Sequence, residues 1–166
     1  HASKTTFSGR AALETQLGVS EADLDFEMAG AEEGPVQRAG PLFAKLTEIM
    51  TTHVGMNRDA EGLNAALEAL NSLESSAANL HVDDNSRLFN SNLLDALRIK
   101  AGIRLAKATV HSALSRTESR GVHQRADFTE TDSEQMYHTL VDIEGNISTL
   151  AIRKGSAGSW VLTPEE

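Results

Sequence analysis

Hydrophobic residues repeat at helical spacing over one long stretch of the chain. Between positions 91 and 117 there is no proline and a single glycine, which predicts one helix of roughly 27 residues, about 40 Å long. Its apolar side chains form two rows on nearly opposite faces. The first row contains Leu94, Leu97, Ala101, Leu105 and Ala108, and the second contains Ile99, Ile103, Ala106, Val110 and Leu114. A helix that is apolar on two faces needs a partner on each, so a row that this chain leaves uncovered must meet another domain or another protein.

Two helices with a single apolar face precede the long one. Pro41 suits the first position of a helix, whose apolar stripe continues until Gly55 ends it. Asp59 can cap the next helix by accepting a hydrogen bond from a free backbone N–H. The stripes contain Leu42, Leu46, Ile49, Met50 and His53 in the first helix, and Leu63, Ala66, Leu67, Leu70 and Leu73 in the second. Short connections between the three helices predict an antiparallel three-helix bundle.

After Arg125 the spacing changes from helical to alternating. Residues 137–143 and 147–152 alternate as half-buried strands do, and Glu144-Gly145-Asn146 between them is a turn signal. An isolated hairpin is marginal in water, so this one needs a surface to lie on. A stretch rich in glycine and serine follows at 153–159, and residues 160–162 could dock back onto the fold.

The pattern therefore predicts a mainly α fold, an antiparallel three-helix bundle with an appended C-terminal β-hairpin. We expect residues 1–40 to form an acidic connector, in which residues 7–17 could make a short helix. Residues 41–126 are expected to form the bundle, and residues 127–166 the loop, the β-hairpin and the tail. Since the chain begins without an initiator methionine or a targeting pattern, we expect it to be an excised piece of a larger protein.

Composition narrows the classes of partner. The 166 residues include 15 basic and 24 acidic side chains, for a net charge of −9, which disfavours nucleic acid and anionic lipid as partners. The absence of cysteine excludes disulfides, thiolate metal sites and cysteine nucleophiles within this sequence. No apolar run approaches the ~20 residues of a membrane-spanning helix, so direct insertion into a membrane is not expected.

The sequence contains none of the common catalytic or cofactor-binding motifs. A glycine-rich dinucleotide loop, a phosphate-binding loop, a zinc-protease motif and a serine-hydrolase elbow are all missing. His81, Asp83 and Asp84 have the types of metal ligands, but a polar loop whose aspartates bind backbone N–H groups explains them better. His53 and His111 lie within predicted helices and are best explained as polar edge residues. We therefore predict no catalytic, cofactor-binding or metal-binding residue.

One segment does concentrate residues that could bind a partner. It comprises residues 118–125, Glu-Ser-Arg-Gly-Val-His-Gln-Arg. They place a glycine, a histidine and two arginines where the long helix ends, and a helix C-terminus attracts positive charge. One interpretation is local capping, with Gly121 in a left-handed conformation and the arginines binding carbonyls and nearby carboxylates. The other is an interdomain clamp in which Arg120, His123 and Arg125 bind another domain. Both can hold at once.

At these residues the sequence resembles the C-terminal domain of the flavoprotein subunit of succinate dehydrogenase and fumarate reductase. The matching stretches are residues 88–94, residues 113–128, which contain the run E-S-R-G-x-H-x-R-x-D-F, and the His-Thr-Leu of residues 138–140. A shorter run, E-S-R-G-x-H, also occurs in the L-aspartate oxidases, so the matching domain of that family is an alternative. A free-standing helical interaction module is the other alternative.

The resemblance implies a parent enzyme that binds FAD, interconverts succinate and fumarate, and passes electrons to an iron–sulfur subunit. In that family the flavin fold and the substrate-binding residues lie upstream of this domain, so the fragment alone is expected to be inactive and free of cofactor. Arg120, His123 and Arg125 then correspond to the motif loop of the family. The implied partners are the upstream flavin-binding domain and the iron–sulfur subunit. The implied location is cytoplasmic, at the inner face of the membrane through partner subunits.

Overall fold

The computed structural model describes residues 36–84, 86, 89–142, 144–154 and 160–162. Its helices are α3 (Ala39–His53), α4 (Ala60–Ala77), α5 (Ser91–Ser115) and the 3-10 turn η1 (Ser133–Gln135). Its strands are β1 (Asn57–Arg58), β2 (Gln124–Arg125), β3 (Tyr137–Val141), β4 (Ile147–Lys154) and β5 (Trp160–Leu162). Residues 1–35 of the connector expected at 1–40 lie outside the described residues. Helix α3 begins at Ala39, so Pro41 is its third residue and not its first, where a missing N–H still costs no intrahelical bond.

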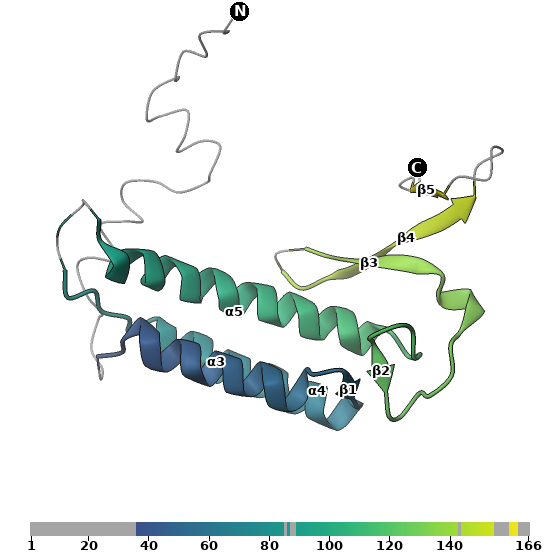
Figure 1. The fold of residues 1–166 in the computed structure, drawn as a ribbon, viewed down its shortest axis with the longest axis horizontal. Helices are drawn as coiled ribbons and strands as arrows, with labels where there is room; N and C mark the ends of the chain where they lie inside the picture. Colours follow the sequence, from purple (N-terminus) through teal and green to yellow (C-terminus); the bar gives the residue numbers. More distant parts are fainter. Residues whose placement is uncertain (1–35, 85, 87–88, 143, 155–159, 163–166) are drawn as a thin grey trace, which may run out of the picture.

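The three helices pack side by side, with α4 antiparallel to α3 and α5 (Figure 1). Asp59 caps α4 as predicted, because its carboxylate accepts a hydrogen bond from the Gly62 N–H at 2.7 Å. Asn90 caps α5 by accepting from the Leu93 N–H at 2.8 Å. None of the helices that the structure describes is long and apolar enough to cross a membrane.

The buried members of the bundle core, among the described residues, are aliphatic side chains, with Phe43 and Met50 packed against them at the edge. Fully or almost fully buried members include Leu42, Leu63, Leu70, Ile99, Ile103 and Val110. The single glycine inside α5, Gly102, allows a close approach to α3, since a Cβ at this position would lie 3.2 Å from Leu46 Cδ2. The predicted stripes of all three helices therefore meet in one bundle.

The two apolar rows of α5 are covered unequally. Ile99, Ile103 and Val110 of the second row are 0–1% exposed in the core, whereas Leu94 and Leu105 of the first row are 58% and 70% exposed. The strands β3 and β4 lie on the other side of α5 from α3 and α4 and cover the C-terminal part of the helix (Figure 1). The chain thus buries most of the second row, with Leu114 half-buried at its end, and leaves part of the first row open.

The C-terminal strands form the predicted hairpin with one addition. Strands β3 and β4 pair antiparallel, with Tyr137 opposite Ala151 and Val141 opposite Ile147. Alternate residues of β3 face α5, since Tyr137, Thr139 and Val141 are half-buried while those between them are exposed. Strand β5 pairs with the end of β4, so residues 160–162 do return to the fold.

Candidate functional site

The motif residues form a loop at the end of the bundle where α5 terminates. The short strand β2 pairs in parallel with β1, which lies in the connection between α3 and α4. The Gln124 N–H donates to the Met56 carbonyl at 3.1 Å, and the Ala126 N–H donates to the Arg58 carbonyl at 2.7 Å. This pairing, which sequence reasoning missed, ties the motif to the other two helices.

Gly121 lies at the apex of the motif in the predicted left-handed conformation, with φ +59°. Arg120 and His123 exchange two backbone hydrogen bonds of 2.8 and 3.1 Å across it. A two-residue hairpin with positive φ at its first central residue is a type II′ turn, which favours glycine there. Since α5 already ends at Ser115, Gly121 shapes this turn and does not cap the helix.

Glu118 is the centre of the motif and is completely buried. It accepts hydrogen bonds from Arg116 Nη2 at 2.6 Å, from Arg120 Nε at 2.9 Å and Nη2 at 3.0 Å, and from the Asp132 N–H at 2.9 Å. The bonds from Arg120 are the main cause that lowers the pKa of Glu118 to about 2, against the opposing effect of burial. The same contact raises the pKa of Arg120. Glu118 is therefore ionised and shared between two arginines.

The side chain of Arg125 caps the C-terminal end of α5. Its Nη1 donates to the carbonyls of Ala113 at 3.0 Å and Arg116 at 2.9 Å, which α5 leaves without intrahelical partners. Its other edge forms a bidentate pair with Asp127, with both N–O distances 2.7 Å. These bonds lower the pKa of Asp127 to about 2. Asp127 also accepts the Ala60 N–H at 2.9 Å, so this pair joins the end of α5 to the start of α4.

Ser119 crosslinks the backbone of the loop. Its hydroxyl accepts the Arg125 N–H at 2.8 Å and lies 2.7 Å from the Phe128 carbonyl, to which it donates. Its own N–H donates to the Glu130 carbonyl at 2.9 Å, and its carbonyl accepts from Thr131 Oγ1 at 2.6 Å. The motif serine is thus buried with its polar groups satisfied.

His123 is half-buried and neutral in this arrangement. Its Nδ1 lies 3.0 Å from Arg58 Nη1, and because arginine can only donate, Nδ1 must be unprotonated. The proton is then on Nε2, which is buried and has no hydrogen-bond partner among the described residues. Burial lowers the pKa of His123, as do the charges of Arg58, Arg125 and Arg116, while the Arg116 carbonyl acts in the opposite direction. A histidine held between arginines is poorly suited to act as a general base.

The structure brings Arg120, His123 and Arg125 onto one loop, as the sequence predicts, but gives each a separate partner inside the domain. Glu118, which joins Arg120 to Arg116, was not predicted as a site residue. An alternating pattern could have revealed it, because Arg116, Glu118 and Arg120 are two apart and share one side of an extended chain. Arg58 carries no comparable signal, since only the tertiary fold brings it to His123.

Arg116 extends this network to the hairpin. Its Nη1 donates to the Tyr137 carbonyl at 2.8 Å, and its Nη2 donates to the Gln135 carbonyl at 2.7 Å. The guanidinium carbon also lies 4.9 Å from the centre of the Tyr137 ring, within cation–π distance. The hairpin is therefore fastened to the bundle through the same residue that binds Glu118.

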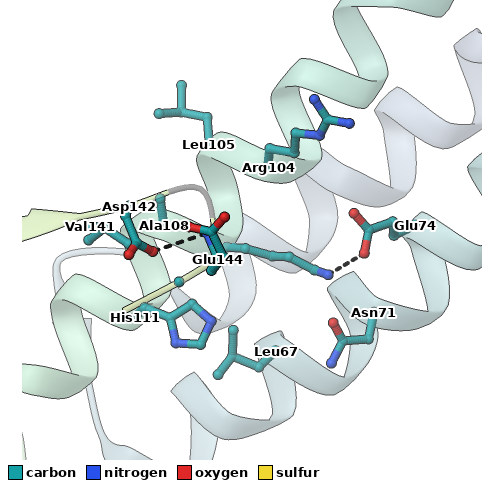
Figure 2. A pocket seen from close by; sticks show the side chains of 12 residues that line it. Leu67, Asn71, Glu74, Arg104, Leu105, Ala108, His111, Val141, Asp142 and Glu144 are labelled. Atoms are coloured by element: carbon teal, nitrogen blue, oxygen red, sulfur yellow. Dashed lines mark hydrogen bonds and ion pairs between the residues drawn. The ribbon is translucent and has the colours of Figure 1, made fainter. Parts of the chain in front are cut away.

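A cavity of about 860 Å³ lies between the hairpin turn and helices α4 and α5 (Figure 2). Its lining contains the apolar residues Leu67, Leu105, Ala108 and Val141, the polar or basic residues Asn71, Arg104, Lys107 and His111, and Glu74, Asp142, Glu144 and Gly145. Lys107 binds Glu74, and Asp142 accepts hydrogen bonds from Asn146 and from the Glu144 N–H. These bonds, led by those from Asn146, lower the pKa of Asp142.

The cavity does not fit FAD. A dinucleotide pyrophosphate needs backbone N–H groups at a glycine-rich turn or a helix N-terminus. Here three carboxylates, Glu74, Asp142 and Glu144, would repel the phosphates, and only Arg104 and Lys107 carry a permanent positive charge. This cavity is therefore poorly suited to a dinucleotide.

The described residues hold no group of three or more potential metal ligands. Asp83 binds Arg38 at 3.2 Å and lies 3.7 Å from His81, and Asp84 accepts the Ser86 N–H at 2.8 Å. Asp84 therefore binds a nearby backbone N–H as expected, whereas Asp83 pairs with the side chain of Arg38, which lies 45 positions away in the chain.

Known proteins are similar to this chain in sequence and in fold. A family model described as "Fumarate reductase flavoprotein C-term" matches residues 43–159. The fumarate reductase flavoprotein subunit of Mycobacterium tuberculosis is 33% identical over 136 residues, 81% of this chain and 23% of that protein. The succinate dehydrogenase flavoprotein subunit of Rickettsia bellii is 35% identical over 101 residues, 60% of this chain and 17% of that protein.

Solved structures also contain chains that are similar to this one. The Mycobacterium smegmatis Sdh1 complex contains a chain with a TM-score of 0.63 and 26% identity, covering 87% of this chain and 24% of that one. A variant of E. coli quinol fumarate reductase has a TM-score of 0.68 at 23% identity, covering 96% of this chain and 26% of that one, which supports the fold. The chain spans about a quarter of the length of these relatives. It belongs to the family of C-terminal domains of fumarate reductase and succinate dehydrogenase flavoprotein subunits.

Proposed function

We propose that this chain is the C-terminal helical domain of a succinate dehydrogenase or fumarate reductase flavoprotein subunit. In this role it supports the flavin-binding domain and the subunit contacts during FAD-dependent interconversion of succinate and fumarate. It contributes no catalytic residue and holds no FAD itself. The family match, and the chain's span of about a quarter of its relatives, support this proposal.

The observation that carries the proposal is how the motif residues are used. The polar groups of five motif residues bind partners within the domain. These residues are Glu118, Ser119, Arg120, Arg125 and Asp127. A catalytic residue must reach substrate or cofactor, whereas these residues fix one loop conformation and join α5 to the segments around it. The motif is therefore best suited to a structural role.

The interdomain role of the motif loop remains part of the proposal. Because Arg120, His123 and Arg125 are engaged internally, we assign them the task of holding the turn rigid against the flavin-binding domain. The residue that projects from that turn is Val122, which is 74% exposed, and Met56 on the paired segment is 69% exposed. A rigid loop with an apolar tip loses little conformational entropy when it docks.

The proposed partners and location follow from the same family. The relatives include chains of an Sdh1 complex and of a quinol-fumarate reductase with bound menaquinol. By extension, the partners of this domain are the upstream flavin-binding domain and an iron–sulfur subunit. Its place is the cytoplasmic side of the membrane, held there by partner subunits.

The test is to isolate the native gene product and compare it with the 166-residue chain. The product should be several times longer, carry FAD and oxidise succinate or reduce fumarate, whereas the chain alone should be colourless and inactive. Glu118→Gln in the full-length product should lower its thermal stability and flavin retention together. A flavin-loaded 166-residue chain, or a native product of this length alone, would contradict the proposal.

A further inference from the structure

The turn before α5 holds an exposed aromatic side chain in an unfavourable backbone conformation. Among the described residues, Phe89 is the only non-glycine residue with positive φ, at +56°. The following residue, Asn90, is buried and donates to the carbonyls of Asp84 at 2.5 Å and Ser86 at 2.8 Å while it caps α5. Asn90 thereby ties Asp84 and Ser86 to the start of α5, while the side chain of Phe89 beside it is fully exposed.

Phe89 lacks the contact that its position normally provides. The residue before a helix cap commonly packs on the fourth helical residue as a hydrophobic staple, which here would join Phe89 to Leu94. Phe89 is 103% exposed and Leu94 is 58% exposed, so this staple is not made. Phe89 has a strained backbone and both apolar side chains are solvated in the isolated domain, which is explained if another surface covers the two residues.

The exposed pair continues into the open row of α5. Leu105 is 70% exposed and lies on the same face as Leu94, about 17 Å further along the helix. Arg98 and Arg104 border this face and are exposed, and Arg98 forms a 3.6 Å ion pair with Asp95. The face is therefore apolar along its centre and positively charged at its borders.

We propose that Phe89, Leu94 and Leu105 form the face that docks onto the flavin-binding part of the parent subunit. The inference rests on the proposed function, since the relatives of this chain are about four times longer and supply such a domain. The surface that fits is apolar, with a recess for the Phe89 ring and carboxylates opposite Arg98 and Arg104. A second copy fits less well, because a self-complementary contact would bring the arginines of the two copies together.

Cysteine labelling tests the proposal directly, since the chain has no cysteine of its own. Leu94→Cys and Leu105→Cys are prepared in the 166-residue chain and in the full-length gene product, and maleimide labelling of each position is followed by mass spectrometry. Both positions should react at least about tenfold more slowly in the full-length product than in the isolated chain. Leu140→Cys, on the outer face of the hairpin, is the control and should change less than about twofold.

The outcomes separate this proposal from the proposed function. Equal labelling rates in a full-length, flavin-loaded product would overturn the docking face and leave the proposed function intact. A native product without a flavin domain would overturn both. Protection in the isolated chain that grows with protein concentration would show a second copy on the face and overturn the assigned partner.

Phe89→Gly provides an independent readout. Glycine adopts positive φ without strain and the Phe89 side chain is fully exposed, so the isolated chain should keep its melting temperature or gain slightly. The full-length product should lose thermal stability and release flavin faster, because the anchor is gone. A loss of equal size in both proteins would show that Phe89 serves the domain itself and would contradict the proposal.

Discussion

The body of the bundle and the loop at its end are held together by opposite kinds of interaction. The body relies on aliphatic side chains such as Leu42, Leu63 and Ile103, which are buried without polar partners. The loop buries Glu118 and Arg125, and satisfies them with bidentate ion pairs and backbone hydrogen bonds. Apolar packing tolerates some rearrangement, whereas a buried ion network fits one geometry.

The difference shows where positional accuracy matters in this domain. A three-helix body needs only a stable core, but the loop joins α5, the connection between α3 and α4, and the hairpin. Fixing these three segments with directional bonds sets their relative positions. The predictions below separate the two kinds of stabilisation.

Glu118→Gln should have the largest effect. Removing the negative charge leaves Arg116 and Arg120 without their buried partner, and breaking such a pair costs about 3–5 kcal/mol. Chemical denaturation at neutral pH measures the loss. Glu130→Gln, at an exposed position of the same loop, is the control and should change the free energy of unfolding by less than ~0.5 kcal/mol. A Glu118→Gln variant as stable as the parent chain would show that the ion network does not stabilise the fold.

Leu70→Ala should destabilise the body by about 2–5 kcal/mol through lost burial and a new cavity. Leu70 is completely buried between the helices. The same denaturation experiment applies, with Leu105→Ala as the matched control, because Leu105 lies on the open face of α5. Equal losses at the two positions would contradict the unequal covering of the helix.

Gly121→Ala should cost about 1–2 kcal/mol for conformational reasons alone. A Cβ at this position would meet no atom within 4 Å, so the penalty comes from φ +59° and not from a clash. Gly121→Asn should lose less, since asparagine tolerates the left-handed region better than alanine does. Thermal unfolding of the two variants measures the difference, and identical stabilities would show that the turn relaxes.

The smallest effect is a dependence of stability on pH through His123. Its pKa is lowered in the folded state, so the unfolded chain binds a proton first as the pH falls below about 6.5. The stability due to neutral His123 is present above this pH and is lost progressively below it. His123→Asn should flatten the slope of unfolding free energy against pH between 6.5 and 5. A slope that the variant leaves unchanged would place the effect on another group.

The body of the domain could be predicted from sequence because its signals are local. Asp59 caps α4, and Leu63 and Leu70 lie on one apolar stripe. Strand β3 shows the predicted alternation of half-buried and exposed residues. Each of these features depends on the spacing of residues within one helix or strand, and this spacing can be read from the sequence.

The loop could be predicted only in part because its partners come from distant segments. The positive φ of Gly121 is readable, but the contact of Arg58 with His123 spans 65 positions. The complete burial of Glu118 also depends on Asp132 and on the path of the following loop. Phe89 lies within a stretch that resembles the family, yet residue spacing reveals neither its complete exposure nor the hydrogen bonds of Asn90 beside it.

The Arg116–Glu118–Arg120 network fastens the hairpin to the bundle. Arg116→Lys keeps the charge near Glu118 but removes the fork that also binds the carbonyls of Gln135 and Tyr137. Native-state hydrogen exchange of this variant is the most direct test. The amides of β3 and β4 should lose protection while those of α3 and α4 keep theirs. Unchanged protection in the hairpin, or an equal loss in every element, would contradict the claim.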